Sequence, residues 1–350
     1  MATFRKMVYC DFEFLKKLRS SNSHFSPFAS GDAMLLWLNT LKFILKSNIQ
    51  LNIDKQMFRE SIRNTDGDTL FELWKRVANG ECEMHFLEDH NIKFVENKIC
   101  MEDATQYAYL IKERKAIAQH YAKSLGVVAF SSDSWMSNTD AKNIEYLYKD
   151  SGCEIPKSER RTWKDILRSK EYHLSECNAM IIIDNYLLKD SISIQKNLYP
   201  ILDELLPTML SKGREFHLTL VSADKNYDRY ESIFSELKKK IKELRPDLLI
   251  KVEIYVEQGI GSLHDRTIIT NNVKIEVPGG FDLINKSDKT TKETKVSILH
   301  PGVQSCSDPC DGTYLRILVN CHEIIRKIRN GSGGRYWSTF ENNKINRLLL

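Results

Sequence analysis

The pattern of apolar and polar positions predicts a regular alternation of strands and helices in the second part of the chain. The continuous apolar run 179–183 is typical of a strand covered on both faces. Further strands are predicted at 216–221, 251–256, 266–270, 273–277 and 296–299, and helices at 198–210, 227–244 and 314–329. The segment 285–294 is polar and predicts a loop with no packing face, whereas the apolar residues of the tail predict that it docks. We therefore expect an α/β domain over residues 178–350.

The first part of the chain combines two strand-like runs with several amphipathic helices. Strands are predicted at 7–10 and 127–130, and helices at 33–46, 54–63, 70–78 and 101–125, with Gly126 closing the last helix. This order predicts a Rossmann-like parallel sheet with many helices over residues 1–150. The polar, Lys- and Arg-rich segment 151–177 predicts a helical junction between two domains, with a basic face that could contact nucleic acid or simply face solvent.

Three acidic residues follow predicted strands directly or within a few positions. Asp11 follows the run 7–10, Asp133 follows 127–130, and Asp184 follows 179–183. Open α/β sheets bind ligands at the carboxyl ends of their strands, so these positions suit a site. An acid at the same position can also cap the helix that comes next. The sequence leaves both roles open.

Length and composition indicate the class of protein but do not identify its function. The 350 residues suit two domains, and 51 basic against 47 acidic residues give a net charge of +4, too even to indicate a nucleic-acid or membrane protein by bulk charge. The chain has no apolar run of transmembrane length and no signal-peptide core at its start, so we expect a cytoplasmic protein with no membrane partner. Eight scattered cysteines indicate reduced thiols.

The motif H-D-R at 264–266 places an imidazole, a carboxylate and a guanidinium in succession before a predicted strand. Together with the strand-D-x-Y signal of Asp184 and Tyr186, it resembles the divergent phospholipase-D-like fold found at the C-terminus of MIT-domain proteins and in bacterial defence and mobile loci. The resemblance covers about residues 178–330. Active members of that superfamily carry His-x-Lys-x4-Asp twice, with one histidine as nucleophile and the other as general acid.

This chain departs from the family pattern, because Arg266 stands where the family has lysine and Asn271 where it has aspartate. No second copy of the motif is present, so cleavage would require two chains to meet across a symmetric interface in a homo-oligomer. Three roles stay open for the motif. It could cleave phosphodiesters, or it could form a structural network with Asp184 or Tyr186. It could also bind a phosphate or nucleic-acid backbone through His264 and Arg266, with Asp184, Tyr186 and Asn271 as further candidate binding residues.

The acidic residues of the first part resemble those of PIN-like nucleases. The resemblance implies carboxylates that hold Mg²⁺ or Mn²⁺ at the carboxyl edge of a parallel sheet, where the metal activates water. The implied catalytic residues are Asp11, Asp103 and Asp133, with Glu102 as a further metal ligand. The third acid is ambiguous, since Glu13 and Glu113 are also candidates.

The two resemblances imply an effector or accessory subunit of an anti-phage or mobile-element defence system. In this hypothesis, the C-terminal domain holds nucleic acid or a partner protein of the same locus, and the N-terminal domain is a possible metal-dependent nuclease. The alternative is a non-enzymatic adaptor whose C-terminal domain binds a partner protein.

Overall fold

The computed structural model divides the chain into two compact α/β units, which are described separately. The N-terminal unit takes in most of residues 1–148, and the C-terminal unit takes in Lys123–Gly126, 149–301 and 310–350. The structure describes residues 7–21, 40–41, 44, 48–62, 68–81, 83–88, 94–95, 98–99, 106–111, 115–132, 151–168, 177–258, 266–299 and 313–349. No helix within these ranges has the length and apolar character needed to cross a membrane.

The N-terminal unit contains a five-stranded parallel sheet in the order β3-β2-β1-β6-β7. Its strands are β1 (Met7–Cys10), β2 (Asn48–Leu51), β3 (Met84–His85), β6 (Gln106–Ile111) and β7 (Val128–Ser131), and a separate hairpin joins β4 (Phe94–Val95) to β5 (Lys98–Ile99). The chain runs outward from β1 to β3 and then returns to place β6 on the other side of β1. The strand order therefore reverses beside β1, which is where open α/β sheets bind ligands.

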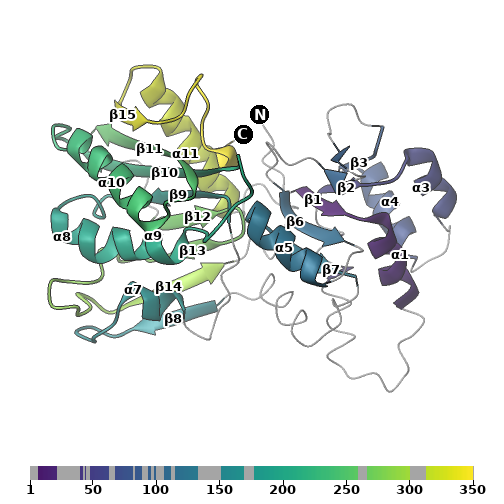
Figure 1. The fold of residues 1–350 in the computed structure, drawn as a ribbon, viewed down its shortest axis with the longest axis horizontal. Coiled ribbons are helices and arrows are strands. Elements are labelled where there is room, and N and C mark those ends of the chain that lie inside the picture. Colours follow the sequence, from purple (N-terminus) through teal and green to yellow (C-terminus); the bar gives the residue numbers. More distant parts are fainter. Residues whose placement is uncertain are drawn as a thin grey trace. The chain divides into compact units, whose positions relative to one another are not determined.

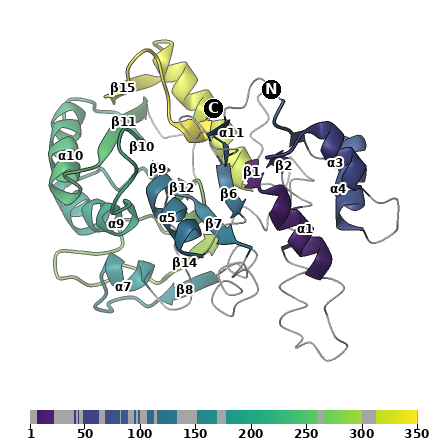
Figure 2. The ribbon, with the colours of Figure 1, turned by 45° about the vertical axis from the view of Figure 1, so that its right-hand side comes forward.

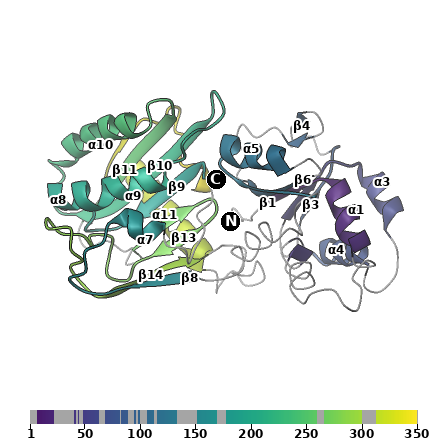
Figure 3. The same cartoon turned by 60° about the horizontal axis from the view of Figure 1, so that its bottom comes forward.

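Amphipathic helices cover this parallel sheet. They are α1 (Phe12–Ser21), α3 (Lys55–Ser61), α4 (Thr69–Ala78) and α5 (Lys115–Leu125). Apolar residues of α1, α3 and α4 pack against Val8, Cys10 and Ile49 of the strands. Figure 3 shows α5 on the other side of the strands from α1 and α4.

The expectation of one long helix over 101–125 is wrong, because residues 106–111 form strand β6. Apolar residues at helical spacing suggested the helix, but Tyr107, Tyr109 and Ile111 also favour a strand. Strand β6 pairs with β1 on one side and with β7 on the other. These tertiary hydrogen bonds override the local helical pattern.

The C-terminal unit contains an eight-stranded mixed sheet in the order β15-β11-β10-β9-β12-β13-β14-β8, which Figure 1 shows from top to bottom. The strands are β8 (Ser151–Ile155), β9 (Ala179–Ile183), β10 (Glu215–Asp224), β11 (Leu249–Gln258), β12 (Thr267–Thr270), β13 (Lys274–Glu276), β14 (Thr294–Leu299) and β15 (Gly334–Ser338). Strands β9, β10 and β11 are parallel to one another, and the remaining neighbours pair antiparallel. The two strands predicted at 266–270 and 273–277 are confirmed as β12 and β13, which pair antiparallel around Asn271 and Asn272.

Helices cover both faces of this sheet, as the fully apolar β9 predicted. They are α7 (Trp163–Leu167), α8 (Ser191–Ser193), η2 (Ile194–Leu198), α9 (Tyr199–Leu205), α10 (Tyr230–Leu244), α11 (Thr313–Arg329) and η3 (Arg347–Leu349). Residues of α7, α9 and α10 share one core with one face of the strands, and residues of α11 and η3 share a second core with the other face. Figure 2 shows α11 across the sheet from α9 and α10.

Two polar segments are more ordered than the sequence suggested. In the expected helical junction 151–177, residues 151–155 form β8 at the sheet edge, and Trp163 is fully buried and donates its indole N–H to Asn197 at 2.9 Å. In the expected loop 285–294, Thr290 is buried, and its hydroxyl donates to the carbonyl of Pro156 at 2.6 Å. Long-range polar contacts, which a local pattern cannot reveal, therefore give both segments a packing face.

Candidate functional site

The carboxyl edge of the C-terminal sheet brings Arg266 next to the residues that follow β9. Thr267 pairs with Ile183 across the antiparallel β9–β12 ladder, so the residue before Thr267 lies beside the residue after Ile183. The Arg266 guanidinium lies 5.1 Å from the centre of the Tyr186 ring, and one of its N–H groups donates to the carbonyl of Pro278. Tyr186 is 44% exposed. The pair forms a cation–π stack that solvent can reach.

Asp184 fixes the backbone around this stack. Its Oδ1 accepts the backbone N–H groups of Tyr186 at 2.6 Å and Leu187 at 2.9 Å, and its Oδ2 accepts that of Phe281 at 2.7 Å. Burial raises the pKa of Asp184, the charge of nearby Asp282 adds to the rise, and the three N–H donors oppose it. The carboxylate joins the end of β9 to the turn after β13, and this is a scaffolding role.

Gly280 allows the charged groups to meet in this turn. Its φ is +91°, and a Cβ at this position would lie 3.2 Å from Asp184 Oδ2, 3.2 Å from Asp282 Oδ1 and 3.3 Å from Arg266 Cδ. Any larger residue would be strained in backbone and crowded by all three side chains. Gly280 thus permits a close approach of side chains at the candidate site.

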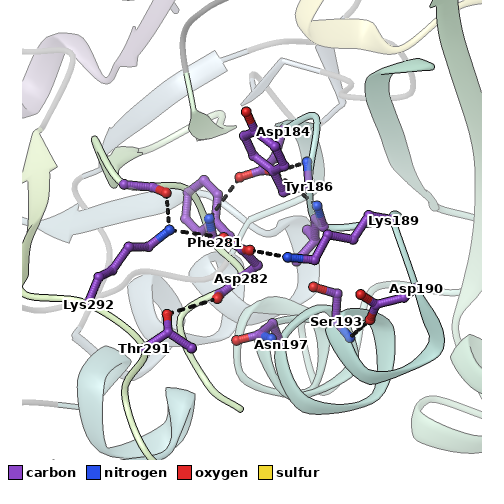
Figure 4. Close-up of polar contacts among 12 residues, drawn as sticks. Asp184, Tyr186, Lys189, Asp190, Ser193, Asn197, Phe281, Asp282, Thr291 and Lys292 are labelled. Atoms are coloured by element: carbon purple, nitrogen blue, oxygen red, sulfur yellow. Dashed lines mark hydrogen bonds and ion pairs between the residues drawn. The ribbon is translucent and has the colours of Figure 1, made fainter. Parts of the chain in front are cut away.

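Two lysines extend the cationic surface, and Asp282 lies between them (Figure 4). Asp282 Oδ2 accepts from Lys189 Nζ at 2.5 Å, and Oδ1 accepts from Lys292 Nζ at 3.1 Å. Lys292 also donates to the carbonyl of Gly279. The hydrogen bond to Asp282 raises the pKa of Lys189. Sequence reasoning missed Asp282 and both lysines as site residues, although Lys189 lies only five positions after Asp184.

Asn271 does not join this cluster, although the family pattern placed it with Arg266. It follows the far end of β12, where its Oδ1 accepts the N–H of Asn178 at 2.9 Å and its Nδ2 donates to the carbonyl of Gly126 at 2.9 Å. The side chain is buried and its role there is structural. His264 and Asp265, the other two members of the motif, lie outside the described residues.

In the N-terminal unit, Asp11 lies where the sequence placed it, directly after central strand β1. It is buried, and its Oδ1 accepts from the Tyr9 hydroxyl at 2.8 Å and from Asn52 Nδ2 at 2.6 Å. Asn52 in turn accepts the N–H of Phe12 at 2.8 Å, which fixes the start of α1. The carboxylate is therefore oriented by neighbouring side chains at the point where the strand order reverses.

Of the acids considered as partners for Asp11, Glu13 is described, and its exposed carboxylate pairs with Lys16 Nζ at 2.7 Å. Glu102, Asp103, Glu113 and Asp133 all fall outside the described ranges. Within those ranges, no group of three or more histidine, cysteine or acidic side chains could hold a metal ion. The Mg²⁺ or Mn²⁺ site therefore stays a prediction from sequence.

Comparison with known proteins assigns the chain to no family. No protein-family model matches it, and no curated protein matches it significantly.

Proposed function

We propose that the carboxyl edge of the C-terminal sheet binds the phosphate backbone of nucleic acid, with Arg266 as the main contact. The observation that carries the proposal is the stack of Arg266 on the exposed ring of Tyr186. A guanidinium has five N–H donors. Among the described residues, the only hydrogen bond of the Arg266 side chain is to Pro278, and it has no ion pair there. The other donors match the fork geometry of a phosphate.

The charge balance around Arg266 supports an anionic ligand. Lys189 and Lys292 share one carboxylate, that of Asp282, and the second carboxylate, that of Asp184, accepts three backbone N–H groups. Three cationic side chains, those of Arg266, Lys189 and Lys292, therefore lie near two carboxylates that already accept hydrogen bonds. The location after parallel strand β9 is also where open sheets bind ligands. This arrangement supports phosphate binding at this edge, whereas the phospholipase-D-like fold and the role in defence are proposed from the sequence resemblance alone.

Replacing Arg266 with alanine is expected to weaken binding of nucleic acid about 10-fold at low salt. The slope of log K against log salt should fall by about 1, because one fewer phosphate is neutralised. Fluorescence anisotropy of labelled oligonucleotides at several salt concentrations would measure both quantities. The matched control is Arg316→Ala, because Arg316 is exposed near the start of α11, away from this edge. Equal affinities of wild type and Arg266→Ala, or no binding by either, would favour the adaptor hypothesis.

A second candidate function, metal-dependent cleavage of nucleic acid, rests on the position of Asp11. A buried, oriented carboxylate at the reversal point of a parallel sheet suits a ligand of Mg²⁺ or Mn²⁺, and it supports the PIN-like assignment. When bound, the metal would activate water for hydrolysis. Tyr9 and Asn52 would hold the Asp11 carboxylate in place.

Asp11→Asn is expected to lower Mn²⁺-dependent degradation of single-stranded RNA or DNA by about 100-fold or more, since losing even an outer-shell partner costs 10- to 100-fold. Asparagine keeps the size of the side chain, so thermal unfolding should show a folded protein. Glu60→Gln is the control, because Glu60 is an exposed acid on α3 that is no candidate for the metal site. Unchanged activity in Asp11→Asn, or none in the wild type, would remove this candidate.

A further inference from the structure

A second stack of arginine on tyrosine lies farther along the same edge of the C-terminal sheet. Arg335, at the start of β15, lies 5.3 Å from the centre of the Tyr227 ring. Its side chain is exposed and has no hydrogen bond or ion pair with any described residue. The edge strand β15 runs antiparallel to β11, so its start lies at the carboxyl end of β11. The sheet edge therefore carries the same pairing of groups at two places.

A groove of about 520 Å³ surrounds Arg335. It lies between the start of α10, the end of α11 and strand β15, and its lining includes Tyr227, Asp228, Glu231, Arg335 and Tyr336. This volume is in the range of pockets that hold small organic groups. Tyr336 is 43% exposed, and its ring stacks on the buried ring of Tyr255 with the centroids 5.4 Å apart. The groove thus offers an aromatic surface that a neighbouring ring holds rigid.

The polar groups of this groove match the edge of a nucleobase better than a free phosphate. The Tyr227 hydroxyl is buried and has no hydrogen-bond partner in the described part of the chain, and Arg335 adds unused N–H donors. Asp228 and Glu231 add carboxylate acceptors, which would repel a phosphate. Bases present both amino donors and ring or carbonyl acceptors, and their faces stack on aromatic side chains.

The two segments that carry Tyr186 and Tyr227 are connected by Arg229. Arg229 donates to the carbonyl of Lys189 and, at 2.5 Å, to Asp224 Oδ2, so it ties the segment after β9 to the segment after β10. Strands β12, β9, β10, β11 and β15 are successive neighbours, as Figure 1 shows. At a strand spacing of about 4.8 Å, Arg266 and the start of β15 lie on the order of 19 Å apart. One extended ligand could contact both.

We propose that this groove binds an unpaired base of a single-stranded nucleic acid whose backbone Arg266 contacts. The inference rests on the proposed function and adds to it the class of nucleic acid, because only an unpaired base can enter a groove and stack on Tyr336. Duplex nucleic acid presents its phosphates to Arg266 but keeps its bases stacked inside the helix. The ligand must also be long enough to reach from one stack to the other.

The test compares Arg335→Ala and Arg266→Ala in the full chain with three probes, namely a trinucleotide, a single strand of about 12 nucleotides and a duplex of the same length. Arg335→Ala should weaken binding of the longer single strand about 10-fold, which is within the range for loss of one bidentate contact to a base edge, and leave the trinucleotide and the duplex unchanged. Arg266→Ala should weaken binding of all three probes. Arg335→Lys, which keeps the charge but not the planar group, should behave nearly as the alanine variant does.

The outcomes separate this inference from the proposal on which it rests. If Arg266→Ala weakens binding and Arg335→Ala changes no probe, the groove inference is overturned and the backbone site stands. If Arg335→Ala weakens the duplex as much as the single strand, or if Arg335→Lys binds as the wild type does, Arg335 contacts phosphate and the base-binding inference is overturned. If Arg266→Ala changes nothing, the proposed function itself fails.

Discussion

Replacing Arg329 with methionine is expected to lower the free energy of unfolding by about 3–5 kcal/mol, the usual cost of removing one partner of a buried ion pair. Its partner Glu253 is 0% exposed on β11, the strand next to edge strand β15. The guanidinium donates to Glu253 Oε2 at 2.9 Å, and the hydroxyls of Thr219 and Tyr255 donate to the same carboxylate at 2.7 and 2.9 Å. Without Arg329 the buried charge has no compensating cation.

Chemical denaturation at neutral pH would measure this loss. Arg326→Met is the matched control, because Arg326 is exposed on the same helix, and its replacement should change the free energy of unfolding by less than about 0.5 kcal/mol. Adding Glu253→Gln to Arg329→Met should restore part of the stability, since a neutral amide needs no counter-charge. A loss below about 1 kcal/mol for Arg329→Met would mean that the pair contributes little.

The same arginine also positions the surface proposed to bind a base. Its guanidinium lies 5.5 Å from the centre of the Tyr336 ring, and it donates to the carbonyls of Asn343 and Lys344 at 3.0 and 2.8 Å. It therefore connects α11, the central strands and the C-terminal tail. Because these bonds occupy its donors, Arg329 acts as a scaffold for the groove, whereas Arg335 has donors available for a ligand.

The elements that could be predicted from sequence are those whose local pattern agrees with their tertiary surroundings. The fully apolar run 179–183 is β9 at the centre of its sheet, and alternation at 251–256 lies within β11. The prediction failed at 106–111, where helical spacing and β-propensity compete and only pairing with β1 and β7 decides. Likewise, β8 could not be foreseen, because its partner β14 lies far away in the sequence.

The candidate site could be predicted only in part, for a similar reason. Asp184 and Arg266 were found because each flanks a recognisable strand, and adjacent strand ends meet in space. Lys292 was missed because it lies in a polar segment whose fold depends on contacts with distant residues. Asn271 was placed in the site by family spacing, whereas the short β12 carries it to the opposite end of the strand from Arg266.

Asp184→Ala is expected to lower the free energy of unfolding by about 3 kcal/mol or more, because three backbone N–H groups lose their acceptor in a buried turn and each such loss costs about 1–3 kcal/mol. The donors belong to Tyr186, Leu187 and Phe281. Asp184→Asn should cost less, about 1–2 kcal/mol, because its amide oxygen can still accept from Tyr186 and Leu187. Its NH₂ group would then face the N–H of Phe281, so that one contact is lost. Denaturant titration of both variants would measure the difference.

The pH dependence of this difference in stability shows whether burial or hydrogen bonding has the larger effect on the pKa of Asp184. Because burial raises the pKa of Asp184 in the folded protein, the folded chain takes up its proton at a higher pH than the unfolded chain, whose carboxyl has the ordinary value of 3.8. The contribution of Asp184 to stability therefore grows as the pH falls through the folded pKa and becomes constant below 3.8. The difference in the free energy of unfolding between wild type and Asp184→Asn should therefore increase from neutral pH towards acidic pH. A gap that narrows would show that the three N–H donors outweigh burial and hold the pKa below its ordinary value. In either case Asp184→Asn should keep the affinity for nucleic acid that Arg266→Ala loses, because Asp184 holds the turn and Arg266 contacts the ligand.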